Sequence, residues 1–122
     1  MAISYRVEPH VLTVGLERDL DLASAADVRA ALDTLLDRYP ERDVRLDLDA
    51  VSFLDSAGLG VVLGRYRRLA ASGHALYLVG VRPQVAAVLT VAGVRQIMTW
   101  EPAVADEGRE RGVVADDGGQ RV

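Results

Sequence analysis

The chain has 122 residues, half of them hydrophobic, and a formal net charge of −4 at pH 7. This length suits one compact domain and is too short for two. The absence of cysteine and the wide separation of the two histidines argue against disulfides, thiolate chemistry and a metal centre. No segment approaches the roughly 18 apolar residues of a membrane span, and no signal peptide is recognised, so we expect a cytoplasmic protein without membrane or direct nucleic-acid partners.

The N-terminal part of the chain combines β-rich runs with one helical pattern. Residues 3–7 and 11–16 are short, β-rich and separated by Glu-Pro-His, which predicts an antiparallel hairpin. Ser24, followed three residues later by Asp27, resembles a weak capping box. Apolar residues then recur at helical spacing, so we expect a first helix over about residues 24–38.

The middle of the chain predicts a strand followed by a helix. Alternation over residues 44–48 puts apolar side chains on one side of a strand. Apolar residues next recur at helical spacing up to a stop at Ser72-Gly73. The face that we expect against the sheet consists of Leu59, Val62, Leu63, Tyr66, Leu69 and Ala70.

The C-terminal elements complete an alternating pattern. Residues 75–80 indicate a buried strand, Pro83 suits the first turn of a third helix, Gly93 suits its end, and residues 97–100 form a last short strand. The predicted order is β-β-α-β-α-β-α-β. Strands separated by single helices imply parallel crossovers, so the expected fold is α/β, with a mixed sheet of four to five strands and helices packed on it.

The end of the chain differs in composition from this body. Residues 101–122 hold six acidic residues, three arginines and several glycines without a sustained period. Such a segment buries too little apolar area to offset chain entropy. We therefore expect one domain over residues 1–100 and an acidic, mostly disordered tail over residues 101–122.

The sequence FLDSAGLG, residues 53–60, joins the third strand to the second helix. Ser56 is a candidate helix cap, a role that contributes about 1 kcal/mol. A cap does not explain Gly58, Gly60 or Gly64, because a glycine inside a helix costs roughly 0.5–1 kcal/mol relative to alanine. These glycines therefore indicate that the helix surface has a further role, which compensates for their cost.

A helical projection suggests that this role is the docking of another protein. If the apolar face lies on the sheet, the opposite face is flat and partly apolar, with arginines at its far end. Ordinary surface residues on a tolerant helix are the alternative. The proposed docking face consists of Gly60, Val61, Gly64, Arg65 and Arg68.

Catalytic interpretations of the same stretch fit poorly. A nucleophile elbow needs glycine two residues before the serine, where this chain has Leu54, and a P-loop needs a lysine, which this chain lacks. The glycines resemble a dinucleotide fingerprint only loosely, because no acidic residue ends the following strand. We interpret the nearby carboxylates as a solvated face rather than a carboxylate or magnesium cluster; they are Asp47, Asp49 and Asp55. We expect no enzyme activity and no cofactor, with nucleotide binding as a weak alternative.

The stretch VRLDLDAVSFLDSAGLGVVL resembles the signature of the STAS domain, the fold of bacterial anti-sigma factor antagonists and of the cytoplasmic ends of sulfate-type transporters. LDLASAADVRAAL and VGVRPQVAAVLTVAGVRQI are similar to other parts of the same domain, so the resemblance covers nearly all of residues 3–100. One departure is visible: Arg18-Asp19 stands where many members have Gly-Glu.

The resemblance implies a function and a site. The chain would bind an anti-sigma factor serine kinase, be phosphorylated at Ser56, and be reset by a serine phosphatase. Asp21 would lie near the serine in the binding surface, together with Asp55, Ala57 and Gly58 from the serine motif. The resemblance also leaves open a non-switching accessory or scaffold subunit of a transporter or stress-signalling complex. We expect a monomer or a weak homodimer.

Overall fold

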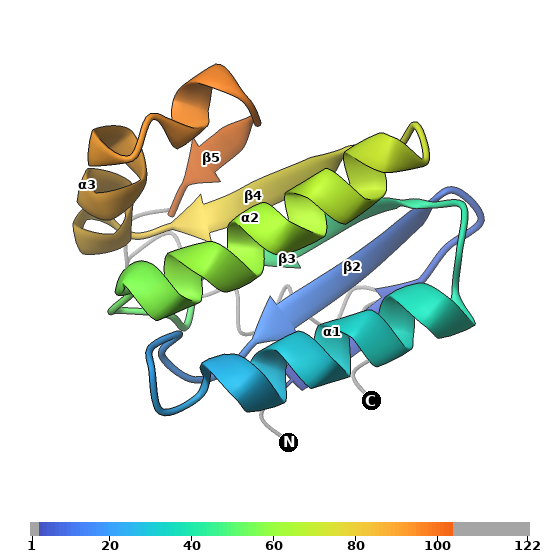
Figure 1. The fold of residues 1–122 in the computed structure, drawn as a ribbon, viewed down its shortest axis with the longest axis horizontal. Helices are drawn as coiled ribbons and strands as arrows, with labels where there is room; N and C mark the ends of the chain where they lie inside the picture. Colours follow the sequence, from blue (N-terminus) through green and yellow to red (C-terminus); the bar gives the residue numbers. More distant parts are fainter. Residues whose placement is uncertain (1–2, 104–122) are drawn as a thin grey trace.

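The computed structural model describes residues 3–103, and it contains five strands, three α-helices and one 3₁₀ turn within that range (Figure 1). The order of strands and α-helices is the predicted one. The elements are β1 (Ile3–Val7), β2 (Val11–Leu16), α1 (Ala25–Arg38), β3 (Asp43–Asp47), α2 (Ser56–Ala71), β4 (Leu76–Val81), α3 (Pro83–Val91), η1 (Val94–Gln96) and β5 (Trp100–Pro102).

The five strands form one mixed sheet in the order β1-β2-β3-β4-β5. β1 and β2 pair antiparallel, which confirms the predicted hairpin, and the remaining neighbours pair parallel. The register aligns Val14 with Leu46 and Leu46 with Leu78. Apolar side chains therefore form rows across the sheet, as alternation along each strand requires.

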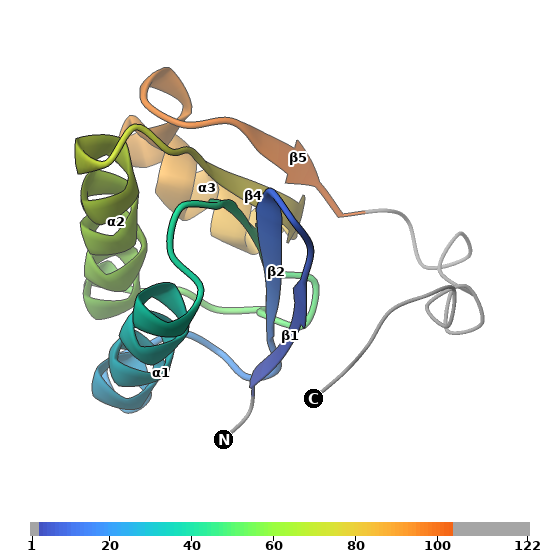
Figure 2. The same ribbon diagram turned by 90° about the vertical axis from the view of Figure 1, so that its right-hand side faces the viewer.

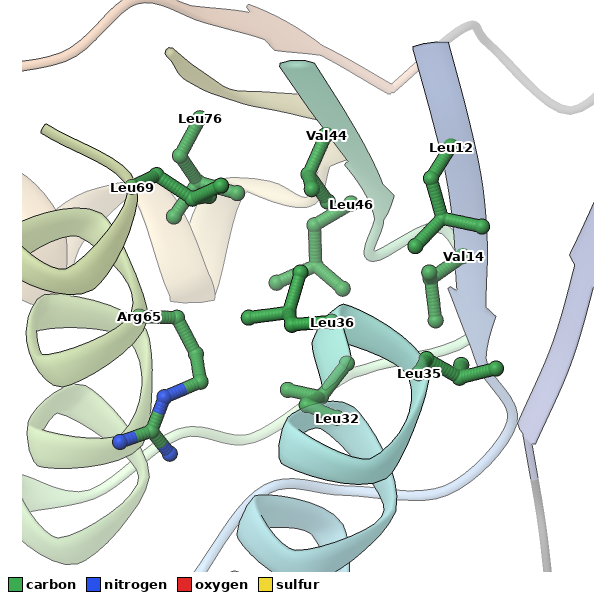
Figure 3. Close-up of a pocket in the computed structure, with 10 residues that line it drawn as sticks. All are labelled: Leu12, Val14, Leu32, Leu35, Leu36, Val44, Leu46, Arg65, Leu69 and Leu76. Carbon is green, nitrogen blue, oxygen red and sulfur yellow. The ribbon is translucent and has the colours of Figure 1, made fainter. Parts of the chain in front are cut away.

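α1 and α2 lie side by side against one face of this sheet (Figures 1 and 2). Leu12, Val14 and Leu46 point from β2 and β3 toward Leu32 and Leu36 of α1 (Figure 3). All five side chains are buried, so the apolar stripe of α1 and the inner row of the sheet form a single core.

The N-terminus of α1 differs from the predicted capping box. Ser24 precedes the helix in a helical backbone conformation and makes no side-chain cap hydrogen bond. Its hydroxyl instead donates to the carbonyl oxygen of Asp19 at 2.8 Å, and its amide donates to the carboxylate of Asp21 at 3.1 Å. The prediction was wrong because a cap needs an extended backbone, and Ser24 belongs to a turn held by contacts outside the helix.

The C-terminal elements lie close to their predicted positions. Pro83 is the first residue of α3, and Gly93, which follows the C-cap residue Ala92, has a φ of 76°, as expected for both residues. The last strand starts at Trp100 rather than at residue 97, because the chain first forms the turn η1, after which the amide of Met98 donates to the carbonyl oxygen of Val94. The predicted tail begins inside β5, because Glu101 and Pro102 belong to that strand, and residues 104–122 of the tail lie outside the described residues. Within residues 3–103, no helix combines the length and apolar character that a bilayer crossing requires.

Candidate functional site

The site begins with a contact between two segments that lie beyond the carboxyl ends of β2 and β3. Leu20 and Leu54 form an isolated parallel bridge, and the amide of Leu20 donates to the carbonyl oxygen of Phe53 at 3.1 Å. Both leucines are buried. The bridge therefore anchors the chain after β2 alongside the strand–helix join that the sequence singles out.

Asp55 connects this join to the segment after β2. One carboxylate oxygen, Oδ1, accepts a hydrogen bond from the amide of Gly58 at 2.9 Å, which caps α2. The other, Oδ2, accepts from the amide of Leu22 at 2.9 Å. Asp55 has the extended backbone of a cap residue, and Ser56 is the first helical residue. The prediction that Ser56 caps the helix was therefore wrong, and the aspartate before it has that role.

The charge of Asp55 follows from these contacts. The amide of Gly58 is the main cause that lowers the pKa of the carboxyl below its ordinary value of 3.8, and the amide of Leu22 adds to it, against an opposing effect of desolvation. Asp55 is therefore ionised at neutral pH. Ser56, directly beside it, has an exposed side chain at the start of α2, so any modification there occurs next to a fixed negative charge.

Asp21, which the resemblance implies in the binding surface, lies in the turn before α1. Its carboxylate accepts from the amide of Ser24, and its carbonyl oxygen accepts from the amide of Ala25 at 2.8 Å. The next residue, Leu22, is the one tethered to Asp55. The turn before α1 is thereby brought to the end of α2 that carries Ser56.

Asp19 is a member of the site that the sequence did not reveal. Its Oδ1 accepts hydrogen bonds from the amide of Ser52 at 2.8 Å, the hydroxyl of Ser52 at 3.0 Å and the amide of Phe53 at 3.1 Å. The sequence flags Arg18-Asp19 only as a departure from a family pattern. No local spacing predicts the role of Asp19, because its partners are 33 and 34 residues away.

The glycines of α2 have two different roles. Gly58 is buried, and a β-carbon there would overlap with the carbonyl oxygen of Leu20. Gly58 is therefore a packing residue, which contradicts its predicted place in an exposed binding surface. A β-carbon at Gly60 or Gly64 would meet no atom within 4 Å, in agreement with the predicted outward orientation of both.

The rest of the predicted docking face needs correction. Val61 is 5% exposed and belongs to the core. The side chain of Arg65 is 14% exposed and pairs with Asp33 of α1, Nε to Oδ1, at 3.3 Å. Arg68 also pairs with Asp33, at 3.2 Å, so the two arginines join α2 to α1.

The helical projection was wrong because the most deeply buried face of α2 is rotated about the helix axis relative to the predicted face. Val62 and Leu69 are buried as expected, but Leu59, Leu63 and Tyr66 are only partly buried and Ala70 is exposed. The fully buried positions are Gly58, Val61, Val62 and Leu69. The close approach at Gly58 fixes this rotation, which a pattern based on side-chain size alone does not detect.

Four small residues of the predicted site remain at least partly exposed along α2. Ser56 and Gly60 are exposed, while Ala57 and Gly64 are half-buried. Within residues 3–103, no three or more side chains of the metal-binding types come together in a group that could hold an ion. The arrangement fits a surface for contact with another macromolecule, in which one hydroxyl lies beside one carboxylate.

Comparison with known proteins gives three informative matches in addition to a family match. The family model described as STAS domain matches residues 2–107. A Paenibacillus polymyxa protein named anti-sigma F factor antagonist is 34% identical over 100 residues, which are 80% of this chain and 86% of the relative. The structure of the Bacillus cell fate determinant SpoIIAA in the phosphorylated form is 27% identical, with a TM-score of 0.61, and the match covers 88% of this chain and 96% of the other.

The third match supports the fold alone. An anti-sigma-factor antagonist (STAS) domain protein from Planctomyces limnophilus is 17% identical and superposes with a TM-score of 0.73, covering 86% of this chain and 93% of the other. The sheet and helices described above are therefore a recurrent arrangement.

Proposed function

The chain belongs to the STAS domain family, and we propose that it is an anti-sigma factor antagonist, a binding protein that sequesters an anti-sigma factor and so frees a sigma factor. The relative from Paenibacillus polymyxa, which carries this name, supports the proposal because the match covers most of both chains. We place the activity in the cytoplasm, where bacterial transcription occurs, and propose no enzymatic role.

The observation that carries the regulatory part of the proposal is the position of Ser56. Its side chain is exposed at the first residue of α2, beside the ionised carboxylate of Asp55. Phosphorylation would add about −1.5 to −2 charges at this point. The N-terminus of a helix tolerates an anion, with a dipole contribution of about 0.3–1 kcal/mol, so the fold need not change.

The effect of the phosphate would fall on the contact with the partner. Like-charge repulsion and desolvation of a few kcal/mol in an interface lower affinity by about a hundredfold, because each 1.4 kcal/mol is a factor of ten. The unmodified protein would bind the anti-sigma factor and the phosphorylated protein would release it. We propose that the anti-sigma factor is itself the serine kinase and that a serine phosphatase restores the binding form.

A phosphorylation experiment tests this function. The protein is incubated with ATP and each purified serine-kinase anti-sigma factor encoded in its own genome, and the modified residue is located by mass spectrometry. We expect phosphate on Ser56 and none on a Ser56→Ala variant. Ser52 is a built-in control, because it is also exposed and lies four residues earlier. Absence of phosphate from Ser56, with no binding to any of these kinases, would favour a non-switching scaffold subunit instead.

A further inference from the structure

Two large apolar side chains are exposed beside Ser56. Leu22 is 80% exposed and Phe53, the only phenylalanine of the chain, is 53% exposed. Leu22 donates its amide to the carboxylate of Asp55, and Phe53 lies two residues before Asp55 in the join. The pair therefore flanks the residue next to the proposed phosphorylation site.

The backbone at both positions is fixed. The amide of Phe53 donates to Asp19 at 3.1 Å, and its carbonyl oxygen accepts from Leu20 at 3.1 Å. Leu22 lies in the turn whose ends are joined by the hydrogen bond from Ser24 to Asp21, and its own amide is held by Asp55. Since neither side chain is exposed through a loose loop, little backbone order has to be gained when a partner covers them.

The surroundings of this pair are acidic. The segment of residues 17–27 contains Glu17, Asp19, Asp21 and Asp27 but only one basic residue, Arg18. Asp55 adds an ionised carboxylate from the join. A matching surface would therefore combine an apolar pocket with a basic rim, because apolar area drives the contact while opposite charges fix orientation and partner choice.

We propose that Leu22 and Phe53 are the apolar anchors of the anti-sigma factor interface, and that the partner receives them in an apolar pocket bordered by arginine or lysine. This inference rests on the proposed function and names the chemistry of the partner surface. The anchors contribute affinity, and a phosphate on Ser56, the first residue of α2, regulates it. A few buried side chains commonly dominate an interface in this way.

Exposed apolar residues at another part of the molecule provide matched controls. Val91 is 90% exposed at the end of α3, and Ile97 is 45% exposed after η1. Truncation of either removes exposed apolar surface without changing a residue of the proposed site. Because all four side chains are exposed, none of the alanine variants is expected to unfold, which circular dichroism and thermal melting would check.

The test measures affinity for the cognate kinase, identified as the anti-sigma factor that phosphorylates the wild-type protein. Leu22→Ala, Phe53→Ala, Val91→Ala and Ile97→Ala are each titrated against it without ATP by isothermal titration calorimetry. Leu22→Ala and Phe53→Ala should each weaken binding by about tenfold or more, as expected for loss of a buried apolar side chain. The two controls should remain within about twofold of wild type.

Other outcomes separate this inference from the proposed function. If wild type binds and both anchor variants bind as tightly as wild type, Leu22 and Phe53 are not the anchors of the interface, while the antagonist function stands. If Val91→Ala or Ile97→Ala shows the large loss instead, the apolar contact lies on the segment of α3 and η1, and the inference is overturned. If wild type binds no anti-sigma factor, the proposed function fails and the inference fails with it.

Discussion

The first turn of α2 packs directly on the backbone of Leu20. A β-carbon at Gly58 would overlap with the carbonyl oxygen of Leu20 and lie 2.9 Å from its Cγ. Leu20 also pairs with Leu54 in the bridge that joins the segment after β2 to the strand–helix join. The contact between Leu20 and Gly58 thus fixes both the rotation of α2 and the place of Ser56.

Gly58→Ala should destabilise the protein. The added methyl group meets rigid backbone, and overpacking of this kind costs about 1–3 kcal/mol. Gly60→Ala is the matched control, since its methyl group meets no atom within 4 Å and alanine favours helix by about 0.5–1 kcal/mol. Urea unfolding of both variants should give opposite changes in the free energy of unfolding. Equal effects of the two substitutions would contradict the packing described at Gly58.

Asp55→Ala should lower the midpoint of urea unfolding at pH 7. The substitution leaves the amides of Gly58 and Leu22 without their carboxylate partner and removes the cap of α2. Asp55→Asn is the control, because asparagine can still cap the helix through its side-chain oxygen.

The destabilisation in Asp55→Ala should depend on pH. Because folding lowers the pKa of Asp55 below 3.8, its ionised form stabilises the fold fully above that value, and the contribution disappears as the pH falls through the lower pKa of the folded state. The difference in unfolding midpoint between wild type and variant, measured from pH 7 to pH 2.5, should therefore become smaller as the pH falls below 3.8. A difference that stays constant over this range would show that the charge of Asp55 has no role.

Asp33→Ala should cost more stability than Asp37→Ala. Asp33 pairs with both Arg65 and Arg68, and its loss leaves the largely buried side chain of Arg65 without its carboxylate. Such a loss costs about 1–3 kcal/mol. Asp37 contacts Arg68 alone and its side chain is 72% exposed, so its removal should cost less than about 1 kcal/mol. Thermal unfolding at low salt would compare them, and a larger effect at Asp37 would contradict a structural role for Arg65.

Much of the fold could be predicted from the sequence because its elements have clear periods. The alternating apolar residues of β3 are all buried, and the helices α1 and α3 begin within one residue of their predicted starts. Pro83 and Gly93 mark α3 because their backbone preferences are local.

The site could be predicted less completely, since its key contacts are long-range. The position of Ser56 at the start of α2 can be predicted from the sequence of the join. The capping residue cannot, because serine and aspartate are equally good caps, and the structure has Asp55 in that role. The role of Asp19 depends on partners across the bridge. Arg65 resembles a surface residue in a helical projection, yet Asp33 on a neighbouring helix allows its side chain to lie mostly buried.

The most direct test of the regulatory mechanism is the affinity of the cognate anti-sigma factor for two forms of this protein. One form is unmodified and the other is quantitatively phosphorylated at Ser56, with circular dichroism spectra establishing that both are folded. The mechanism predicts that phosphorylation weakens binding by about a hundredfold, as like charges beside Asp55 require, with the fold unchanged. Equal affinities for the two folded forms would contradict it.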